Sequence, residues 1–490
     1  MKVCVIGAGP AGIAAAKVMK EDGFHVTVYD KYDKVGGIWT PEGFYEGLRN
    51  QSPDYLYEFS ELPNPQYMPR AADVQGYLEK YARKFGLLEL IQFGTEVVRV
   101  RPVATDAVPG TNGWHVHIRS AATGPAGHTQ SFDHVVVASG AHHCPHIPDF
   151  PGQEHFTGTV THSRHMREAQ ISGRRVTVIG GGKSALEIAN HAALNGSKVT
   201  LVQRHLNWMM PERMIFGIVS TKWLFFSRFS EALLPTYHDA THVRRIDRIP
   251  ASVKKLIWNA IMRDSLISSG LGKLFRQRPI MPLPQGLVHF GVVPRGYTQQ
   301  VRQGNIRVLI DSVDSYTTEG LRLGSGTEIC ADTIVLATGQ RRMFPFLEPA
   351  VQMKDQNDSL RLYKGIVPPD TKNLGLIGFR HLFQFLLGTE LCSHWLSSYF
   401  LQTLPHAPGR EEMLKEVESR LAWQEKVLPA SGGYEFGPYT LHSVDELLAD
   451  MGLSTRRSNG FFSNLLPVNA KHYAGLAAER RERVRALGGS

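Results

Sequence analysis

Two stretches of the chain repeat one pattern of apolar and polar positions. In the first, a short apolar run at 3–6 precedes a glycine-rich turn, a stretch of helical periodicity up to Gly23, and a second apolar run. In the other, an apolar run at 176–179 precedes a similar turn, a helical stretch over 184–195, and again an apolar run. The order of strand, helix and strand predicts a parallel βαβ unit, so we expect an α/β protein with two Rossmann-like units.

The glycines of the two turns indicate a binding chemistry. Gly7 and Gly180 permit a tight turn after the strand, and Gly9 and Gly182 let the backbone approach a pyrophosphate. The phosphates are then expected at the helix N-terminus, where free N–H groups and the helix dipole favour negative charge. The residues expected to form the two sites are Gly7, Gly9, Ala11 and Gly12 in the first unit, and Gly180, Gly182, Lys183, Ser184 and Ala185 in the second.

The residue that ends the second strand differs in charge between the two units. Asp30 ends it in the first unit, and an acid at this place accepts hydrogen bonds from a ribose 2′-hydroxyl. Arg204 ends it in the second unit, and a base suits a 2′-phosphate. We therefore expect FAD in the first unit and NADPH in the second, which points to redox chemistry on a flavin. Glu187, one turn into the second helix, is expected to be a surface or capping charge.

Two similar apolar runs that end in glycine, at 134–140 and 333–339, read as paired crossings between one domain and another inserted into it. Between the units, the pattern predicts a helix over 71–85, a strand over 96–103 and a β-meander over 110–127. The expected fold class is α/β, with two Rossmann-like dinucleotide-binding domains and a helical insertion. The expected domains are 1–150 as the first part of the FAD-binding domain, 151–335 as the NADPH-binding domain, and 336–490 as the return to the FAD domain with C-terminal helices.

The segment at about 212–290 does not fit a βαβ unit and is rich in Trp, Phe, Lys and Arg, so we expect a helical insertion. Its apolar stretch at 214–234 is interrupted by charges, which argues against a membrane-spanning helix. Two interpretations stay open. The first, which we favour, is a helical cap over the nucleotide domain or a contact in a homo-oligomer. The second is peripheral membrane contact through 214–275, with basic residues toward the lipid headgroups.

Composition narrows the class of protein. Hydrophobic residues make up 42% and charged residues 20% of 490 residues, as in soluble globular enzymes. The net charge of +9 is spread along the chain without a basic run, so nucleic acid is not an expected partner, whereas anionic cofactors are. The four cysteines are far apart, so neither a CxxC dithiol nor a metal site is predicted. The first strand is predicted to begin at residue 3, which leaves no room for a signal peptide, and free thiols suit a reducing compartment. We therefore expect a cytoplasmic protein. It would be membrane-associated only if the second interpretation of the insertion holds.

The segment between the two units carries a family resemblance. Its motif Phe156-Thr-Gly158-Thr-Val-Thr-His162, preceded by a proline-rich stretch at 145–152, resembles the linker of the flavin-containing monooxygenases. The resemblance covers nearly the whole chain. Further matching segments are Gly36-Gly37-Ile-Trp39, Arg204 with Trp208 and Pro211, Ala337-Thr338-Gly339, and Asn373-Leu-Gly-Leu-Ile-Gly378. The resemblance implies that Gly37, Trp39, Gly339 and Gly378 lie at the cofactor sites and that His162 orders the linker between the domains.

Two departures from the family pattern concern the reaction. Met166 stands where the family has an aromatic residue after the linker His, and where Baeyer–Villiger relatives have Trp. The family's stretch Tyr-x-x-Leu-x-Thr-Asn-x-Pro reads Tyr45-Glu-Gly-Leu-Arg-Asn50-Gln51-Ser-Pro53 here. Gln51 therefore stands in the place of the family's Asn, and Asn50 in the place of its Thr. The amide is kept on a longer arm.

The resemblance implies a mechanism and a substrate class. NADPH reduces the flavin, which reacts with O2 to a C4a-hydroperoxide and transfers one oxygen atom to a small organic substrate, by N-, S- or C-oxygenation. Gln51, or Asn50, is then expected to donate a hydrogen bond near the flavin N5 or the peroxide.

Two alternatives stay open at this point. The first is Baeyer–Villiger oxygenation of ketones, which the absence of Trp at Met166 disfavours. The second is an NADPH-dependent flavin reductase or oxidase that inserts no oxygen. The lack of a CxxC dithiol disfavours a disulfide reductase, whereas Gln51 keeps the other reductases and oxidases open.

Overall fold

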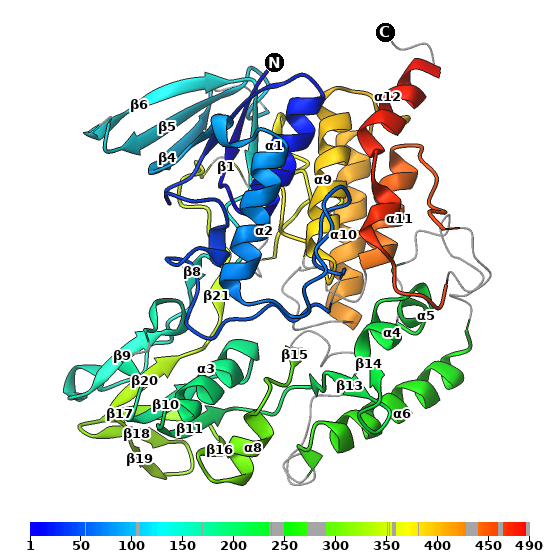
Figure 1. Ribbon diagram of the computed structural model, residues 1–490. Coiled ribbons are helices and arrows are strands. Elements are labelled where there is room, and N and C mark those ends of the chain that lie inside the picture. The colour runs from blue at the N-terminus through cyan, green and yellow to red at the C-terminus, as the bar shows by residue number, and fades with distance from the viewer. Residues whose placement is uncertain are drawn as a thin grey trace.

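The structure is a computed structural model with two α/β domains (Figure 1). The first domain lies at the top of the view, the second at the lower left, and both chain termini lie at the top. The described residues are 1–53, 55–103, 108–122, 124–167, 170–234, 237, 249–272, 291–349, 351, 353–354, 359–380, 382–427, 440–458 and 464–486.

Five parallel strands form the sheet of the first domain, in the order β22-β7-β1-β2-β3. The central strand β1 is buried along Val3–Ile6, because Val3 and Val5 lie in a core with helical residues on one face of the sheet, and Cys4 and Ile6 lie in a second core with Trp114 and Val116 on the other. The edge strand β22 comes from the far end of the chain, so the sheet is completed only after the second domain. The strands are β1 (Lys2–Ile6), β2 (His25–Tyr29), β3 (Ile91–Gln92), β7 (His134–Val137) and β22 (Leu374–Leu376).

The second domain repeats this architecture with a parallel sheet of its own, in the order β16-β11-β10-β20-β9. Its helix α3 (Lys183–Leu194) follows β10 as α1 (Pro10–Glu21) follows β1. The predicted fold class, with two Rossmann-like units, is confirmed. The strands are β9 (Thr159–His162), β10 (Arg175–Ile179), β11 (Lys198–Gln203), β16 (Ile306–Ile310) and β20 (Thr333–Leu336); a short helix α8 (Tyr297–Arg302) precedes β16.

Each domain also carries a three-stranded antiparallel meander before its last crossing strand. The sequence predicted the first meander, and the second is an addition that the structure supplies. The repeat of strand, helix, strand and meander therefore extends beyond the glycine turns. The strands are β4 (Thr95–Pro102), β5 (Trp114–Ser120) and β6 (Gly124–Phe132) in the first domain, and β17 (Val313–Thr317), β18 (Gly320–Leu323) and β19 (Glu328–Cys330) in the second.

The two segments that connect the domains lie side by side. Strand β8 (Cys144–Pro145) leaves the first domain and pairs antiparallel with β21 (Gln340–Arg341), which returns to it. The backbone N–H of His146 donates to the Gly339 carbonyl, and the Thr338 hydroxyl donates to the His146 carbonyl. The second domain is therefore joined to the first through one short two-stranded ribbon.

Helices from the C-terminal part cover the first sheet. The helix α9 (Phe385–Phe400) packs beside α1 and is buried along most of its length, which explains its apolar composition. The apolar residues from Phe379 on suggest a helix directly after Gly378, but α9 begins only at Phe385, after a turn. Arg480 fixes the last helix by donating to Asp22 at the end of α1. The other helices are α2 (Ala71–Lys84), α10 (Arg410–Val427), α11 (Thr440–Asp450) and α12 (Leu476–Ala486), with short 3₁₀ turns at Gly37–Trp39, Leu88–Leu90, Gln153–His155, Ser163–His165 and Ala470–Tyr473.

The insertion is helical only in part. It begins with a hairpin of β13 (Arg213–Met214) and β14 (Val219–Ser220), followed by three helices; residues 238–248 and 273–290 lie outside the described part. No described helix of the chain has both the length and the apolar character that crossing a bilayer requires. The helices are α4 (Thr221–Phe225), α5 (Arg228–Ala232) and α6 (Ala251–Ser268), and β12 (Met209–Met210) pairs with β15 (Gly291–Val292) at the base.

The insertion contacts the C-terminal helices of the first domain. The carboxylate of Glu231 on α5 accepts hydrogen bonds from the backbone N–H groups of Leu441 (2.6 Å) and His442 (2.9 Å) at the start of α11. Arg228 donates twice to Asp445, at 2.7 and 3.0 Å. A carboxylate at a helix N-terminus and a bidentate ion pair are both favourable contacts, so α5 braces the second domain against the first.

Candidate flavin and nucleotide sites

The first glycine turn has no room for larger side chains. Gly7 has a φ of +108°, and a Cβ on Gly12 would lie 1.8 Å from the Gly7 carbonyl oxygen. A Cβ on Gly378 would come within 2.8 Å of the Ala11 Cβ. The start of α1 therefore meets two backbone segments at a distance that only glycine permits, which suits a bound pyrophosphate.

A second glycine pair lies against this turn. The Cα of Gly37 would be 3.6 Å from a Cβ on Gly9, so the two backbones approach closely. The indole N–H of Trp39 donates to the Tyr57 hydroxyl (2.9 Å), and the two rings meet edge to face. Gly9, Gly37 and Gly378 thus converge from three distant parts of the chain on the N-terminus of α1, as a dinucleotide site requires.

Asp30 lies at the end of β2 and belongs to the same site. Its carboxylate accepts hydrogen bonds from the backbone N–H groups of Ala8 (2.5 Å) and Tyr32 (2.8 Å). Burial raises the pKa of Asp30, while these two N–H groups oppose the rise. Since each carboxylate oxygen has more than one lone pair, Asp30 holds the turn and can still accept from a ribose hydroxyl.

The second turn is built in the same way but is more open. A Cβ on Gly180 would lie 2.2 Å from the Ala337 carbonyl oxygen, whereas a Cβ on Gly182 would meet nothing within 4 Å. Asn207 supports the turn because its amide donates to the Gly181 carbonyl (2.7 Å). Asn207 belongs to no motif recognised in the sequence, and its only signal there is an amide four residues after the end of β11.

Basic side chains gather beside the second turn. Arg204 is exposed at the end of β11, and Arg341 donates from Nε to Nδ1 of His146 (3.1 Å). Burial lowers the pKa of His146, and the positive charges of Arg341 and Arg204 lower it further. Arg341, which the sequence analysis did not single out, therefore shares the neighbourhood of Arg204, and both cations are available to a phosphorylated ribose.

His162 is bonded within the linker. Its Nδ1 accepts from the Arg164 N–H (3.2 Å), and this assigns the proton to Nε2, which donates to the Gly339 carbonyl (3.0 Å). Arg164 continues the contact by donating to the Tyr32 hydroxyl of the first domain. Met166 is fully buried in the core of the second domain. The geometry thus gives His162 and Arg164 positions that join the two crossing segments.

The two amides singled out in the sequence have different environments. Asn50 is buried, and its side-chain oxygen accepts from the Ser52 N–H (2.5 Å) in a local turn. The Nε2 of Gln51 is also buried but has no hydrogen-bond partner among the described residues. It lies beside β15, since a Cβ on Gly291 would be 3.6 Å from it. A buried, unsatisfied N–H donor marks a place for a ligand, so Gln51 fits the role better than Asn50 does.

The loop that carries these amides rests on α3 of the second domain. Tyr45 donates to Glu187 (2.6 Å), and Lys183 donates both to Glu187 (2.6 Å) and to the Arg49 carbonyl (2.7 Å). A Cβ on Gly47 would lie 3.1 Å from the His191 ring. The expectation that Glu187 is a surface or capping charge was wrong, because this carboxylate is buried between the domains.

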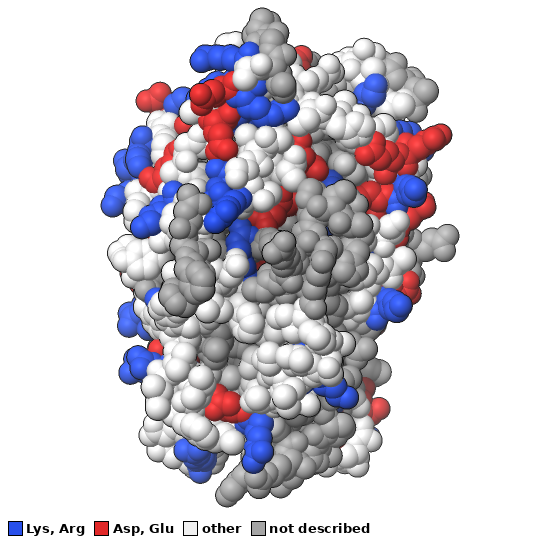
Figure 2. All heavy atoms as spheres, turned by 90° about the vertical axis from the view of Figure 1, so that its right-hand side faces the viewer, with Lys and Arg blue, Asp and Glu red and all other residues white. Residues whose placement is uncertain are grey.

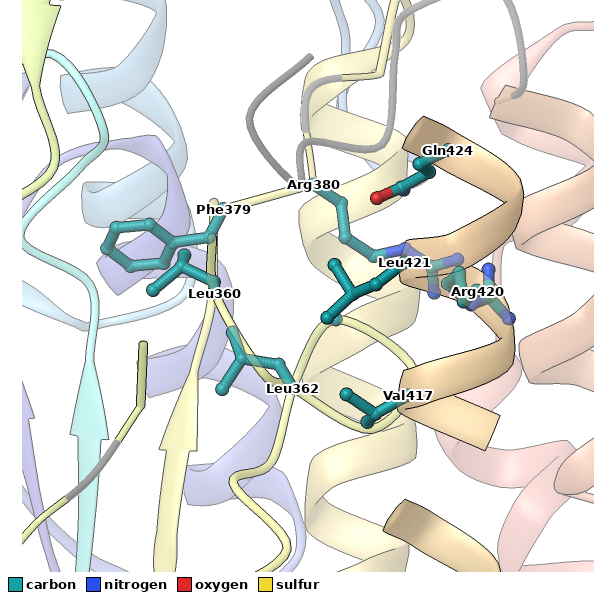
Figure 3. Close-up of a pocket in the computed structure, with 9 residues that line it drawn as sticks. Leu360, Leu362, Phe379, Arg380, Val417, Arg420, Leu421 and Gln424 are labelled. Carbon is teal, nitrogen blue, oxygen red and sulfur yellow. The ribbon is translucent and has the colours of Figure 1, made fainter. Parts of the chain in front are cut away.

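A small cavity lies in the first domain, between α10 and the segment at 360–380 (Figure 3). Val417 and Leu421 project into it from α10, whereas the Phe379 ring points away from that helix. Its volume of about 30 Å³ suits a water molecule and is far too small for an organic substrate. The lining residues are Leu360, Leu362, Gly365, Phe379, Arg380, Val417, Arg420, Leu421 and Gln424.

The fold and the two turns define a class of protein: an α/β protein with two Rossmann-like domains of the dinucleotide-binding type. The sequence matches the family model described as flavin-binding monooxygenase-like over residues 1–248 and 297–453. The chain belongs to this family, and it is a flavin-dependent monooxygenase.

Relatives and solved structures agree with this assignment. The chain is 27% identical to a probable flavin-containing monooxygenase 1 of Arabidopsis thaliana, over 98% of this chain and 97% of the relative. It is 27% identical to the human flavin-containing monooxygenase 2, over 92% and 82% of the two chains. The fold is similar to that of an S-allyl-L-cysteine S-oxygenase from Allium sativum (TM-score 0.64, 20% identity, 98% and 93% covered). It is also similar to that of a cyclohexanone monooxygenase (TM-score 0.63, 18% identity, 92% and 98% covered).

Proposed function

We propose that this protein uses FAD and NADPH to insert one oxygen atom from O2 into a small organic molecule at a nucleophilic nitrogen, sulfur or carbon atom. Two electrons from NADPH and two protons reduce the second oxygen atom to water, which balances the reaction. A bound flavin, once reduced, supplies the activation of O2. The observation that carries the proposal is the Nε2 of Gln51, which is buried beside β15 of the second domain and has no partner within the described part of the chain.

The chain's own residues divide the remaining work. The turns at Gly7–Gly12 and Gly180–Ala185 bind the two pyrophosphates, and Asp30 and Arg204 select the two riboses. Arg341 supports Arg204 from the neighbouring crossing segment, since both lie close to His146. A guanidinium pair next to a 2′-phosphate favours NADPH over NADH.

Gln51 offers an N–H donor at Nε2 in the region between the cofactors. Asn50 fixes the backbone turn that positions this side chain. This Nε2 is buried, and β15 lies beside it. A Baeyer–Villiger reaction is the second candidate, favoured by the similarity in fold to cyclohexanone monooxygenase. Met166 is packed in the core and offers no polar or aromatic group in the place of the Trp of such enzymes.

The test is a substrate panel of amines, thioethers and ketones with the purified flavoprotein. We expect NADPH to bleach the flavin, and an amine or thioether to give one oxygenated product for each NADPH that is consumed. Lactones or esters from the ketones alone would favour the second candidate. NADPH consumption that yields only hydrogen peroxide with every substrate would reject oxygen insertion.

We also propose that the insertion seats the protein on a membrane surface. Its exposed apolar side chains include Phe216 (76% exposed), Ile218 (73%) and Leu256 (70%), from the β13–β14 hairpin tip and from α6. Asp264 on α6 holds this tip, because it accepts from the backbone N–H groups of Ile215 and Phe216. Ile215 and Phe216 both have left-handed backbone conformations, and the hydrogen bonds from their N–H groups hold them there, so the conformation of the apolar tip is fixed by the fold.

The charge around this surface indicates what covers it. Arg213, Lys255 and Arg263 are exposed on the same hairpin and helix, which suits a membrane that contains anionic lipid. In Figure 2, which views the molecule from the right-hand side of Figure 1, most charged side chains lie in the upper half, and the described atoms of the lower half are mainly white with scattered Lys and Arg side chains. The alternative is that a second copy of the chain covers this surface. Vesicle binding and light scattering of the same variants distinguish a membrane from a second copy.

A further inference from the structure

We infer that Lys183, Glu187 and Tyr45 form a latch through which a dinucleotide in the second domain sets the position of Gln51. The inference rests on the proposed NADPH site and goes beyond it, because none of the three is assigned a role in flavin chemistry. The latch residues are defined by their contacts: Tyr45 and the Arg49 carbonyl on the loop, and Lys183 and Glu187 on α3.

The contacts follow one face of α3. Lys183, Glu187 and His191 are spaced by four residues, so they lie above one another on the helix surface. Each touches the loop: Lys183 at the Arg49 carbonyl, Glu187 at the Tyr45 hydroxyl, and His191 against Gly47. The loop is therefore laid along the helix and held at three successive turns.

Tyr45 shows that the attachment is tight. It precedes the linker in sequence, yet its ring is 7% exposed and packs in the core of the second domain. Burial raises the pKa of Tyr45 far above its usual range, with the Glu187 charge adding to the rise, so the phenol stays a donor. One oxygen of Glu187 accepts from both Tyr45 and Lys183, so the carboxylate joins the loop to the cation.

Lys183 connects this attachment to the nucleotide. It is the first residue of α3 and directly follows the turn at Gly180–Gly182, where phosphates bind to the helix N-terminus. Its side chain is 24% exposed and so is accessible to an arriving phosphate. A phosphate and the group formed by Glu187 and the Arg49 carbonyl therefore compete for one cation. The peptide of Arg49 leads directly into Asn50 and Gln51, so this competition acts on the amide.

The test compares two substitutions that differ in charge. Glu187→Gln removes a negative charge near the phosphate site and frees Lys183, so the Kd for NADP⁺ is expected to fall about two- to fivefold. Tyr45→Phe breaks the hydrogen bond but keeps the charge, so the Kd is expected to stay within about twofold of the wild-type value. A purely structural role for Glu187 would instead weaken NADP⁺ binding.

Two further readouts follow the loop. In the wild-type flavoprotein, NADP⁺ is expected to change hydrogen–deuterium exchange in the peptide that covers 44–51, and this response is expected to be lost in both variants. The share of NADPH that ends as hydrogen peroxide is expected to rise in both. Glu231→Gln, at a buried carboxylate between α5 and α11, is the control: it is expected to lower the Tm without changing the NADP⁺ Kd or the loop's response.

The outcomes separate the latch from the proposed function. If wild-type protein does not bind NADP⁺, the proposed nucleotide site is wrong and the latch with it. If NADP⁺ binds but Glu187→Gln loosens it, or if the 44–51 peptide responds to NADP⁺ in both variants as in wild type, the latch alone is wrong.

Discussion

Gly378 lies against Ala11 although 366 residues separate them in the chain, so closely that a Cβ on the glycine would come within 2.8 Å of the alanine Cβ. Ala11 is at the start of α1, and Gly378 follows the last strand of the same sheet. The chain therefore leaves the first domain, builds the second, and returns to close the first cofactor site. This contact makes the flavin site dependent on the complete fold.

Gly378→Val is expected to lower the flavin content. The residue has a φ of +90°, which disfavours any side chain, and the added methyl groups would press on Ala11. Together these are expected to destabilise the protein by roughly 2–4 kcal/mol. The measurement is the ratio of flavin to protein absorbance, together with the Tm. Gly304→Ala is the control, because Gly304 also has positive φ but an open surrounding, so flavin content is expected to stay as in wild type.

Arg204→Ala is expected to lower the preference for NADPH over NADH by roughly 1.5–3 kcal/mol, the range of a hydrogen bond to a charged group. The comparison is the kcat/KM for the two donors in flavin reduction. Arg341→Ala is expected to have the same direction and a smaller effect. Arg307→Ala, at an exposed position on β16, is the matched control. An unchanged preference in Arg204→Ala would contradict the 2′-phosphate assignment.

Gln51→Asn is expected to keep, or improve, the yield of oxygenated product for each NADPH consumed, because it restores the amide on the shorter arm of the family pattern. Gln51→Ala is expected to raise the share of hydrogen peroxide, because it removes the donor at Nε2. Product and peroxide are measured in the same reaction. If Gln51→Asn abolishes product, the register of Asn50 and Gln51 is wrong.

Glu390 is expected to make stability depend on pH. Burial raises its pKa to about 7, although the Ser60 N–H and hydroxyl, which both donate to it, oppose the rise. The neutral acid is favoured in the fold, so its contribution is complete below the ordinary pKa and is lost as the pH rises through about 7. Between pH 5 and 8, wild type is expected to lose roughly 1–3 kcal/mol relative to Glu390→Gln in urea unfolding. A parallel pH dependence of the two proteins would contradict this.

The double substitution Phe216→Ser, Ile218→Ser is expected to reduce sedimentation with vesicles that contain phosphatidylglycerol, because it removes the two most exposed apolar side chains of the hairpin tip. Leu194→Ser, at a 60% exposed apolar residue of α3, is the matched control. Light scattering on the same proteins tests the other occupant. A dimer that the double substitution converts to a monomer, without any vesicle binding by wild type, would assign the surface to a second copy.

Short sequence patterns were sufficient to predict much of the fold. The turns at Gly7–Gly12 and Gly180–Ala185, with the apolar strands around them, predicted both parallel units because glycine and burial act over a few residues. The second meander has short strands with mixed burial, and its alternation is too brief to recognise. Helix α9 begins at Phe385 and not at Phe379, because apolar composition does not distinguish a buried turn from a helix start.

The contacts of the candidate site were harder to anticipate. The hydrogen bond from Tyr45 to Glu187 joins residues 142 positions apart, and no local pattern indicates such a partner. Glu187 looks like any polar residue near a helix N-terminus until the loop is packed on it. Likewise, Asn50 and Gln51 are adjacent amides, and only the fold makes one a turn former and leaves the Nε2 of the other without a partner among the residues that the structure describes.

The brace from α5 to α11 has a consequence for how the two domains can rotate. By itself, the ribbon of β8 and β21, with two residues in each strand, would offer little resistance to a twist of one domain relative to the other. Glu231 and Arg228 bind α11 on the opposite side of the molecule from this ribbon (Figure 1), where a small rotation of the domain gives a large displacement. Rotation of the second domain therefore either moves α11 with it or breaks the contacts of both side chains. The insertion thus limits the angle through which the two domains can rotate relative to each other.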